Sequence, residues 1–292
     1  MNEPEALDRE CLRGFPLPRH SEESDKEDRG RLLVVAGSRE TAGAALLAGL
    51  GGLRAGAGKL QIATAASVSM ALCIAVPEAR VVGWAESADF CLAPEAIAPL
   101  LEMTAETDSL VIGCGLQHGP ALDAMLDALL ASDSDTPLVL DAAVLGSLAT
   151  RADALSAWRG GAILLPHSRE MARLLDCELE AVEADPLAAA RRAAQRFHSL
   201  ALIKGSYSHV VAPDGRAFRF KGGGVGLATS GSGDVLAGIV GGLVARGADP
   251  LTATLWGVYL HGEAGRLLSR DIGRIGFLAR ELLDRVPALM VD

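Results

Sequence analysis

Short, uninterrupted apolar runs recur along the chain, and helical patterns separate them. Strands are predicted over 32–36, 60–64, 79–83, 109–113, 137–141, 161–165 and 200–204, and helices over 42–55, 120–130 and 187–197. Apolar runs without alternation are typical of strands that are covered on both faces. The sequence therefore predicts an α/β fold of three layers, with a mostly parallel sheet between two layers of helices.

Two further segments complete this expected fold. Residues 209–212 and 217–220 flank Asp214-Gly215, which predicts a hairpin near the end of the sheet. Residues 234–291 are expected to be mainly helical. The polar, charge-dense segment 1–30 predicts a flexible or surface-laid N-terminal arm. No linker or repeat divides the remainder, so we expect residues 31–292 to form a single domain.

Composition limits the classes of partner. Half of the 292 residues are hydrophobic, which is enough for a sizeable core, and the net charge of −10 argues against a nucleic-acid surface. No apolar run suits a membrane span or a secretory signal. The five cysteines have no metal-ligand or redox-motif spacing, so we expect reduced thiols and a cytoplasmic location.

The stretch from Gly222 to Gly238 is the strongest indication of a binding site. Seven of its 17 residues are glycine, and it leads directly into an apolar helical pattern. Backbone N–H groups of such a loop can approach a ligand closely, and the helix N-terminus adds free donors and partial positive charge. Glycine and aspartate also occur in ordinary turns. The length of the glycine run, with its hydroxyl residues, favours a phosphate site.

One carboxylate, Asp234, lies inside this predicted phosphate site. A site that only holds phosphate gains nothing from a negative charge there. A site that takes a proton from a hydroxyl group beside a phosphate needs a base. Asp234 is therefore the candidate catalytic residue.

Polar or glycine residues follow five of the predicted strands. They are Gly37-Ser38, the segment 113–115, Asp141, Pro166-His167 and Lys204-Gly205. Ligands of open α/β sheets bind beyond the carboxyl ends of the strands, so these residues predict one active-site edge.

Three residues at this edge have both a binding and a structural interpretation. Lys204 could hold phosphate oxygens or lie in a tight turn, and His167 could bind substrate or serve the fold. Glu170 could order water around a metal ion or complement the dipole of a helix that Ser168 caps.

Taken in order, these motifs resemble the ADP/ATP-dependent NAD(P)H-hydrate dehydratases of the ribokinase-like superfamily. The resemblance covers about residues 26–290. It rests on segments 34–38, 43–44, 53–58, 112–116, 140–142, 166–170, 204–205, 228–238 and 261–262.

The resemblance implies a ribokinase-like fold and a repair reaction. ADP or ATP would phosphorylate the ring hydroxyl of the hydrated (6-hydroxy) form of NADH or NADPH, and loss of phosphate would restore the normal cofactor. Mg²⁺ would bridge the nucleotide phosphates. The implied substrate-binding residues are Ala44, Gly115, His167 and Asp234; the nucleotide-binding residues are Lys204, Gly205, Ser206, Tyr207, Ser208 and Gly233; the anion hole is formed by Gly231, Ser232 and Gly233.

The chain departs from the family pattern at three places. Ala143 replaces an aspartate, Leu165 replaces the threonine before Pro166-His167, and the loop before Ala228 lacks a common asparagine. The epimerase domain that is fused to many bacterial members is not found in this sequence, so the resemblance implies a separate epimerase as a partner.

Two alternatives stay open at this point. A kinase of the same fold that acts on a hydroxymethylpyrimidine or thiazole alcohol would share Asp234 and the anion hole. A catalytically degenerate protein would bind nucleotide without turnover. The choice between ADP and ATP, the choice between the NADH and NADPH hydrates, and a homo-oligomeric state are also open.

Overall fold

The computed structural model describes residues 3–21, 23–87 and 91–291. The strands are β1 Glu5–Ala6, β2 Arg31–Val35, β3 Lys59–Ala65, β4 Ala79–Trp84, β5 Ser109–Ile112, β6 Leu138–Leu140, β7 Ala162–Leu164, β8 Leu200–Ile203, β9 Tyr207–Val211 and β10 Ala217–Lys221. The helices are α1 Arg9–Leu12, α2 Ala42–Arg54, α3 Ala66–Ala75, α4 Ile97–Ala105, α5 Pro120–Leu130, α6 Ala143–Ser147, α7 Ala152–Ser156, α8 Ser168–Leu175, α9 Leu179–Ala184, α10 Pro186–Phe197, α11 Ser232–Ala245, α12 Pro250–Asp271, α13 Ala279–Leu282 and α14 Val286–Leu289.

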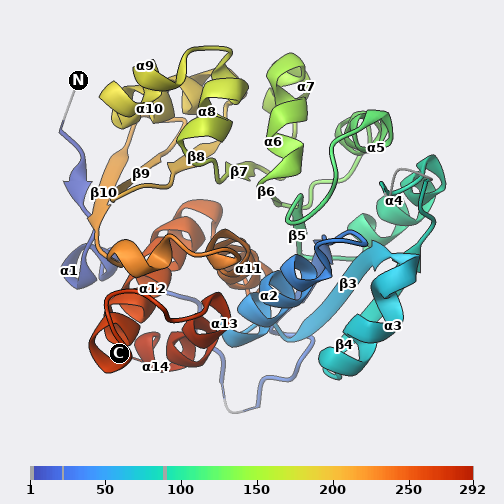
Figure 1. The fold of residues 1–292 in the computed structure, drawn as a ribbon, viewed down its shortest axis with the longest axis horizontal. Helices are drawn as coiled ribbons and strands as arrows, with labels where there is room; N and C mark the ends of the chain where they lie inside the picture. The colour runs from blue at the N-terminus through green and yellow to red at the C-terminus, as the bar shows by residue number, and fades with distance from the viewer. Residues whose placement is uncertain (1–2, 22, 88–90, 292) are drawn as a thin grey trace.

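The strands form one sheet in the order β1-β10-β9-β8-β7-β6-β5-β2-β3-β4. Every pairing from β8 to β4 is parallel, while β9 is antiparallel to both β8 and β10. The predicted parallel sheet and terminal hairpin are therefore confirmed. The carboxyl ends of β2, β5, β6, β7 and β8 lie at the same edge (Figure 1).

Two layers of helices cover this sheet (Figure 1). Successive residues of a strand point to opposite faces, and β2 shows this directly. Leu32 and Val34 pack in the core with α2, α11 and α12, whereas Leu33 and Val35 pack in the core with α4, α5 and α10. The predicted three-layer architecture is confirmed. Among the described residues, no helix is both long and apolar enough to span a membrane.

The N-terminal segment lies against this domain. β1 adds to the sheet beside β10, and Leu7 and Leu12 are buried in the core. The Phe15 ring meets the Phe218 ring edge-on at 5.6 Å, and its carbonyl accepts a hydrogen bond from Trp256 Nε1 at 2.7 Å. These contacts correct the prediction of a flexible arm for the segment from β1 to Phe15. Residues 1–2 and 22 of the predicted arm lie outside the described residues.

Candidate active site

The glycine-rich loop ends at the first turn of α11, beside the carboxyl ends of β6 and β8. A Cβ atom added to Gly233 would lie 3.4 Å from Lys204 Nζ and 3.7 Å from Asp141 Oδ2. In the described part of the chain, no side chain caps α11, and the backbone N–H groups of Gly233 and Asp234 donate no hydrogen bond. Free amides at a helix N-terminus favour an anion. The local structure therefore suits the predicted phosphate site.

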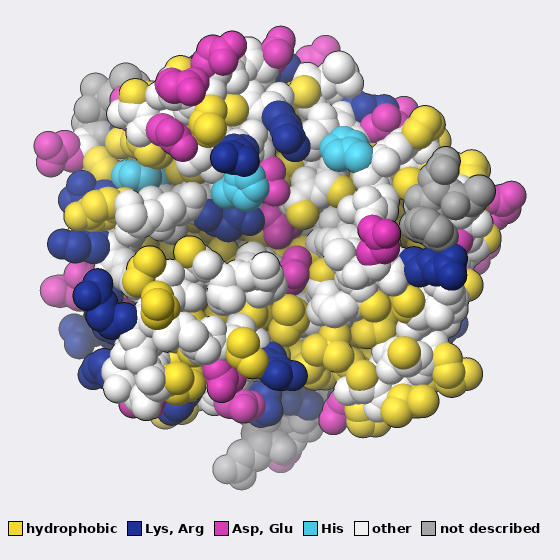
Figure 2. All heavy atoms as spheres, viewed as in Figure 1, with side chains coloured by type: hydrophobic (Ala, Val, Ile, Leu, Met, Phe, Trp, Pro, Cys, Tyr) yellow, Lys and Arg dark blue, Asp and Glu magenta, His cyan; other side chains and the backbone are white. Residues whose placement is uncertain are grey.

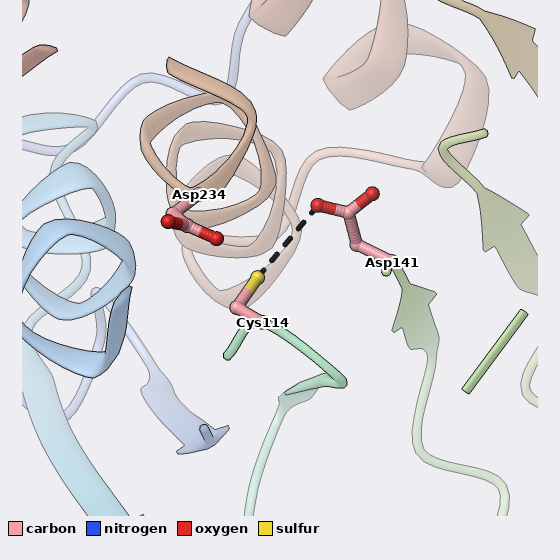
Figure 3. A group of neighbouring side chains, drawn as sticks. All are labelled: Cys114, Asp141 and Asp234. Carbon is pink, nitrogen blue, oxygen red and sulfur yellow. Dashed lines mark hydrogen bonds between the residues drawn. The ribbon is translucent and has the colours of Figure 1, made fainter. Parts of the chain in front are cut away.

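Asp234 lies in a cluster with Cys114 and Asp141 (Figure 3). Cys114 follows β5, Asp141 follows β6, and Asp234 belongs to the first turn of α11. One ligand atom from each side chain lies within 4.8 Å of the other two. The Cys114 thiol donates a hydrogen bond to Asp141 Oδ2 at 3.8 Å, and Lys204 Nζ donates one to Asp141 Oδ1 at 2.7 Å.

Gly113 allows the ends of β5 and β6 to approach each other closely. Its φ of 122° lies in the region that favours glycine, and an added Cβ atom would overlap the carbonyl oxygen of Asp141. Any other residue here would push Cys114 away from Asp141. The glycine before Cys114 is thus a condition for the cluster.

Burial dominates the charge state of Asp234. Burial, together with the smaller effect of the Asp141 carboxylate, raises the pKa of Asp234 to about 6. The Cys114 thiol and the Lys204 ammonium act in the opposite direction. At neutral pH the carboxyl is mainly ionised, yet it is far more basic than an exposed aspartate. This suits a general base.

The two neighbours of Asp141 keep their protons. Burial alone would lower the pKa of Lys204, but the Asp141 and Glu170 carboxylates outweigh burial and raise it. Burial, followed by the charges of Asp141 and Asp234, raises the pKa of Cys114 well above its usual range. Lys204 is therefore a cation and Cys114 a neutral S–H donor.

The donor set at the cluster bears on the expected Mg²⁺. Mg²⁺ prefers oxygen ligands and is usually held by one or two carboxylates together with substrate phosphates and water. Here Cys114 contributes sulfur, and Lys204 already occupies one oxygen of Asp141. The residues therefore fit a magnesium ion that nucleotide phosphates and water hold, rather than one in a protein cage.

A cavity of about 770 Å³ opens beside the cluster. Its polar wall includes Lys204, Gly205, Ser206, Ser208, Thr229, Ser232, Gly233, His167 and His261; its apolar wall includes Phe220, Val225, Leu227, Leu236 and Val258. Figure 2 shows the face of Figure 1, hollowed near its centre, where basic, acidic and histidine side chains gather. The apolar wall suits the base and sugar of a nucleoside, and the polar wall with the α11 amides suits its phosphates.

His261 connects α12 to the start of α11. Its Nε2 atom lies 2.9 Å from Ser232 Oγ and 3.0 Å from the Ser232 carbonyl oxygen. Burial lowers the pKa of His261 to about 4, so the ring is neutral near pH 7. Since the carbonyl oxygen can only accept, Nε2 carries the proton. His261 therefore holds the turn that contains Ser232 and Gly233.

The histidine at the end of β7 caps α8, which corrects the predicted role of Ser168. His167 Nδ1 accepts hydrogen bonds from the amides of Arg169 and Glu170, at 3.1 and 3.3 Å. Glu170 Oε2 accepts from the His167 amide at 2.9 Å, and Oε1 lies 3.3 Å from His167 Nε2. His167 still lines the cavity, whereas both oxygens of Glu170 are engaged. A metal ion would meet Glu170 through water.

Two predicted substrate-binding residues lie side by side, whereas one predicted nucleotide-binding residue lies apart. Ala44 is buried next to Gly115, whose added Cβ atom would lie 2.6 Å from Ala44 Cβ. Tyr207 stands apart from the other predicted nucleotide-binding residues. In the β9–β10 register it pairs with Lys221, one position before the Ser208–Phe220 pair that lines the cavity, so its side chain faces the opposite side.

Sequence reasoning missed part of the site. It placed Asp141 at the active-site edge but did not foresee its ion pair with Lys204, and it assigned Cys114 no role of its own. Ala143, where the family pattern has an aspartate, begins α6. The only signal for Cys114 was its position between two glycines at a strand end.

Comparisons with known proteins show the family of this chain. The family model described as NAD(P)H-hydrate dehydratase matches residues 32–288. The ADP-dependent (S)-NAD(P)H-hydrate dehydratase of Xanthomonas campestris is 44% identical over 281 residues, which cover 96% of this chain and 94% of that protein. The bifunctional NAD(P)H-hydrate repair enzyme of Moorella thermoacetica is 37% identical over 94% of this chain, which spans 52% of that enzyme's length.

A solved structure of a dehydratase has the same fold as this chain. The ADP/ATP-dependent NAD(P)H-hydrate dehydratase of Bacillus subtilis, co-crystallised with ATP and Mg²⁺, superposes with a TM-score of 0.81 at 29% identity. The alignment covers 98% of this chain and 97% of that one. The match of the family model, the identity to full-length relatives and the shared fold agree: this chain belongs to the NAD(P)H-hydrate dehydratase family.

Proposed function

We propose that this chain restores NADH and NADPH from their hydrated forms in a reaction that consumes ADP or ATP, as a carbon–oxygen lyase. The observation that carries this proposal is the position of Asp234: a carboxylate with a pKa of about 6 beside free amides at the rim of a nucleotide-sized cavity. Family membership supports the same activity.

The reaction begins with activation of the ring hydroxyl. Its oxygen attacks the terminal phosphorus of the nucleotide while its proton passes to Asp234. Phosphate then leaves with the electron pair of the C–O bond, and loss of a proton from the adjacent ring carbon restores the double bond. Hydroxide leaves poorly and phosphate leaves well, so phosphorylation makes the elimination feasible.

The surrounding residues position the phosphates and neutralise charge, which is the main task of the protein in phosphoryl transfer. The amides of Gly233 and Asp234 form the anion hole at the start of α11, and His261 holds that turn through Ser232. This revises the predicted set of Gly231, Ser232 and Gly233, because the Ser232 amide already donates to the Thr229 carbonyl oxygen at 3.3 Å. Lys204 places a partly buried cation at the same edge. Mg²⁺, held by the nucleotide phosphates and through water by Glu170, would neutralise charge on the transferred group.

Further features of this proposal concern partners and location. No disulfide joins any two of the five cysteines, all of which lie among the described residues, and this fits the reducing cytoplasm. A homo-oligomeric state and a separate epimerase, which would interconvert the two hydrate epimers, stay predictions. So do the preferences between ADP and ATP and between the NADH and NADPH hydrates.

Absorbance at 340 nm tests the activity. The chain is mixed with NADPH hydrate, Mg²⁺ and ADP or ATP, and released phosphate is measured in parallel. We expect the band to return with one phosphate per NADPH. Asp234→Asn should lower the rate by about 10²–10⁴-fold, because it removes the general base. Asp153→Asn is the control, since Asp153 also lies in the first turn of a helix but is exposed.

Three outcomes would overturn the proposal. A stable phosphorylated product without return of the band would indicate an alcohol kinase instead. Nucleotide binding without turnover would indicate a degenerate binding protein. Full activity of the Asp234→Asn variant would exclude Asp234 as the base.

A further inference from the structure

We propose that Cys114 is a positioning residue for Asp234: its thiol, which donates to Asp141, lies close enough to share its one hydrogen with the Asp234 carboxylate and so to hold Asp234 as an ionised base. The inference deepens the proposed function and rests on it, since Asp234 is taken as the base. Cys114 does not line the nucleotide cavity and has no part in bond making.

The geometry around Cys114 carries the inference. The side chain is fully buried, and its sulfur lies between the carboxylates of Asp141 and Asp234 (Figure 3). It donates to Asp141 Oδ2 at 3.8 Å, and a carboxylate oxygen of Asp234 lies within 4.8 Å of the sulfur. A bond from the thiol to that oxygen favours the ionised form of Asp234, which is the direction in which Cys114 acts on the pKa of this group. A thiol carries one hydrogen, so the two carboxylates share one donor.

Three strand ends around Asp234 each bring one group that favours or disfavours the ionised form of its carboxyl. The end of β6 brings the Asp141 carboxylate, which disfavours a second negative charge, and the end of β8 brings the Lys204 ammonium, which favours it. The loop after β5 brings the Cys114 thiol, which favours the ionised form as well. Lys204 is held 2.7 Å from Asp141, whereas the longer 3.8 Å bond from Cys114 to Asp141 leaves the thiol able to turn towards Asp234.

The thiol therefore has a measurable consequence for the base. A hydrogen bond to a carboxylate favours the ionised form, and its loss raises the pKa. Without the S–H group, only Lys204 would oppose the rise in the pKa of Asp234 that burial and Asp141 cause. The enzyme would then lose activity on the acid side of its pH profile, where the base is already partly protonated.

Alanine and serine variants separate this role from simple packing. The two side chains are close in size, but only serine can donate. We expect Cys114→Ala to move the acid limb of kcat/KM upward by about 0.5–1 pH unit, which is a loss of about two- to fivefold at pH 6 and little change at pH 8. The limb of Cys114→Ser should lie closer to that of the unmodified chain. Thermal denaturation verifies that both variants are folded.

An activity-independent measurement separates failure of this inference from failure of the proposed function. The chain is labelled with [4-¹³C]aspartate, and the Asp234 resonance is assigned by its absence in Asp234→Asn. Its titration should move to higher pH in Cys114→Ala and return towards the original value in Cys114→Ser.

The two measurements have distinct outcomes. A shifted titration in a chain that never restores the 340 nm band would support the role of Cys114 and overturn the proposed reaction. An active chain whose alanine and serine variants titrate alike, in both the resonance and the acid limb, would overturn the role of Cys114.

Discussion

The carboxyl group of Asp234 carries a charge in a place that disfavours it. Burial, with the help of Asp141, raises its pKa from 3.8 to about 6. The unfolded chain thus releases this proton at lower pH than the folded chain does. The contribution of Asp234 to stability is full below about pH 4 and is lost as pH rises towards 6. Near neutral pH the ionised base destabilises the fold.

Removal of this charge should stabilise the chain. We expect Asp234→Asn to raise the free energy of unfolding by about 1–3 kcal/mol at pH 8, and to change it little at pH 4, where the native carboxyl is protonated. Urea denaturation at the two pH values measures the difference. Asp153→Asn, at an exposed first-turn position, should change stability by less than about 0.5 kcal/mol at both. An equal effect of Asp234→Asn at pH 4 and pH 8 would contradict the argument.

At the scale of elements, the position of Asp234 depends on how closely α11 packs against α2. Gly238 of α11 lies against the backbone of α2, and an added Cβ atom would overlap the carbonyl oxygen of Ala48. The backbones can approach this closely because glycines of both helices meet there: a Cβ atom added to Gly51 of α2 would lie 3.3 Å from Gly238 Cα. Since α11 also carries the free amides and Asp234, this contact positions the anion hole.

Two glycine-to-alanine substitutions test the contact between these helices. Gly238→Ala should lower the free energy of unfolding by about 2 kcal/mol or more, because α11 must move away from α2. Gly43→Ala is the matched control: Gly43 is exposed on α2, nothing lies within 4 Å of its added Cβ atom, and alanine there should stabilise by up to about 1 kcal/mol. Guanidinium denaturation measures both. Stabilisation by the two variants to the same extent would mean that helix propensity, not packing, governs Gly238.

The sequence predicted most elements correctly because the signals for them are local. Apolar runs marked the strands, and their carboxyl ends do form one edge that brings Asp141 and Lys204 together. The cap of α8 was predicted incorrectly, since the choice between His167 and Ser168 depends on side-chain geometry. Cys114 was not assigned because its role arises only when three distant segments meet.

At the scale of the whole molecule, segments far apart in the chain complete the sheet and the core. The two-residue strand β1 extends the sheet beside β10, and the Arg9 guanidinium lies 5.5 Å from the centre of the Trp256 ring. A strand this short has no sequence period, and its charged neighbours resemble a disordered segment. The local pattern therefore indicated an arm, whereas long-range burial decides where these residues lie.

Burial of Leu12 gives a direct test of whether the N-terminal segment belongs to the cooperative fold. The side chain is 1% exposed and packs in the core with α11 and α12. Leu12→Ala should lower the free energy of unfolding by about 2–4 kcal/mol, through lost burial and the cavity left behind. Glu10→Ala, at an exposed position of the same short helix, should have little effect. Neither residue lines the cavity or belongs to the cluster around Asp234, so kcat/KM at 25 °C should not change. A Leu12→Ala variant as stable as the unmodified chain would mean that the segment unfolds independently, as a flexible arm does.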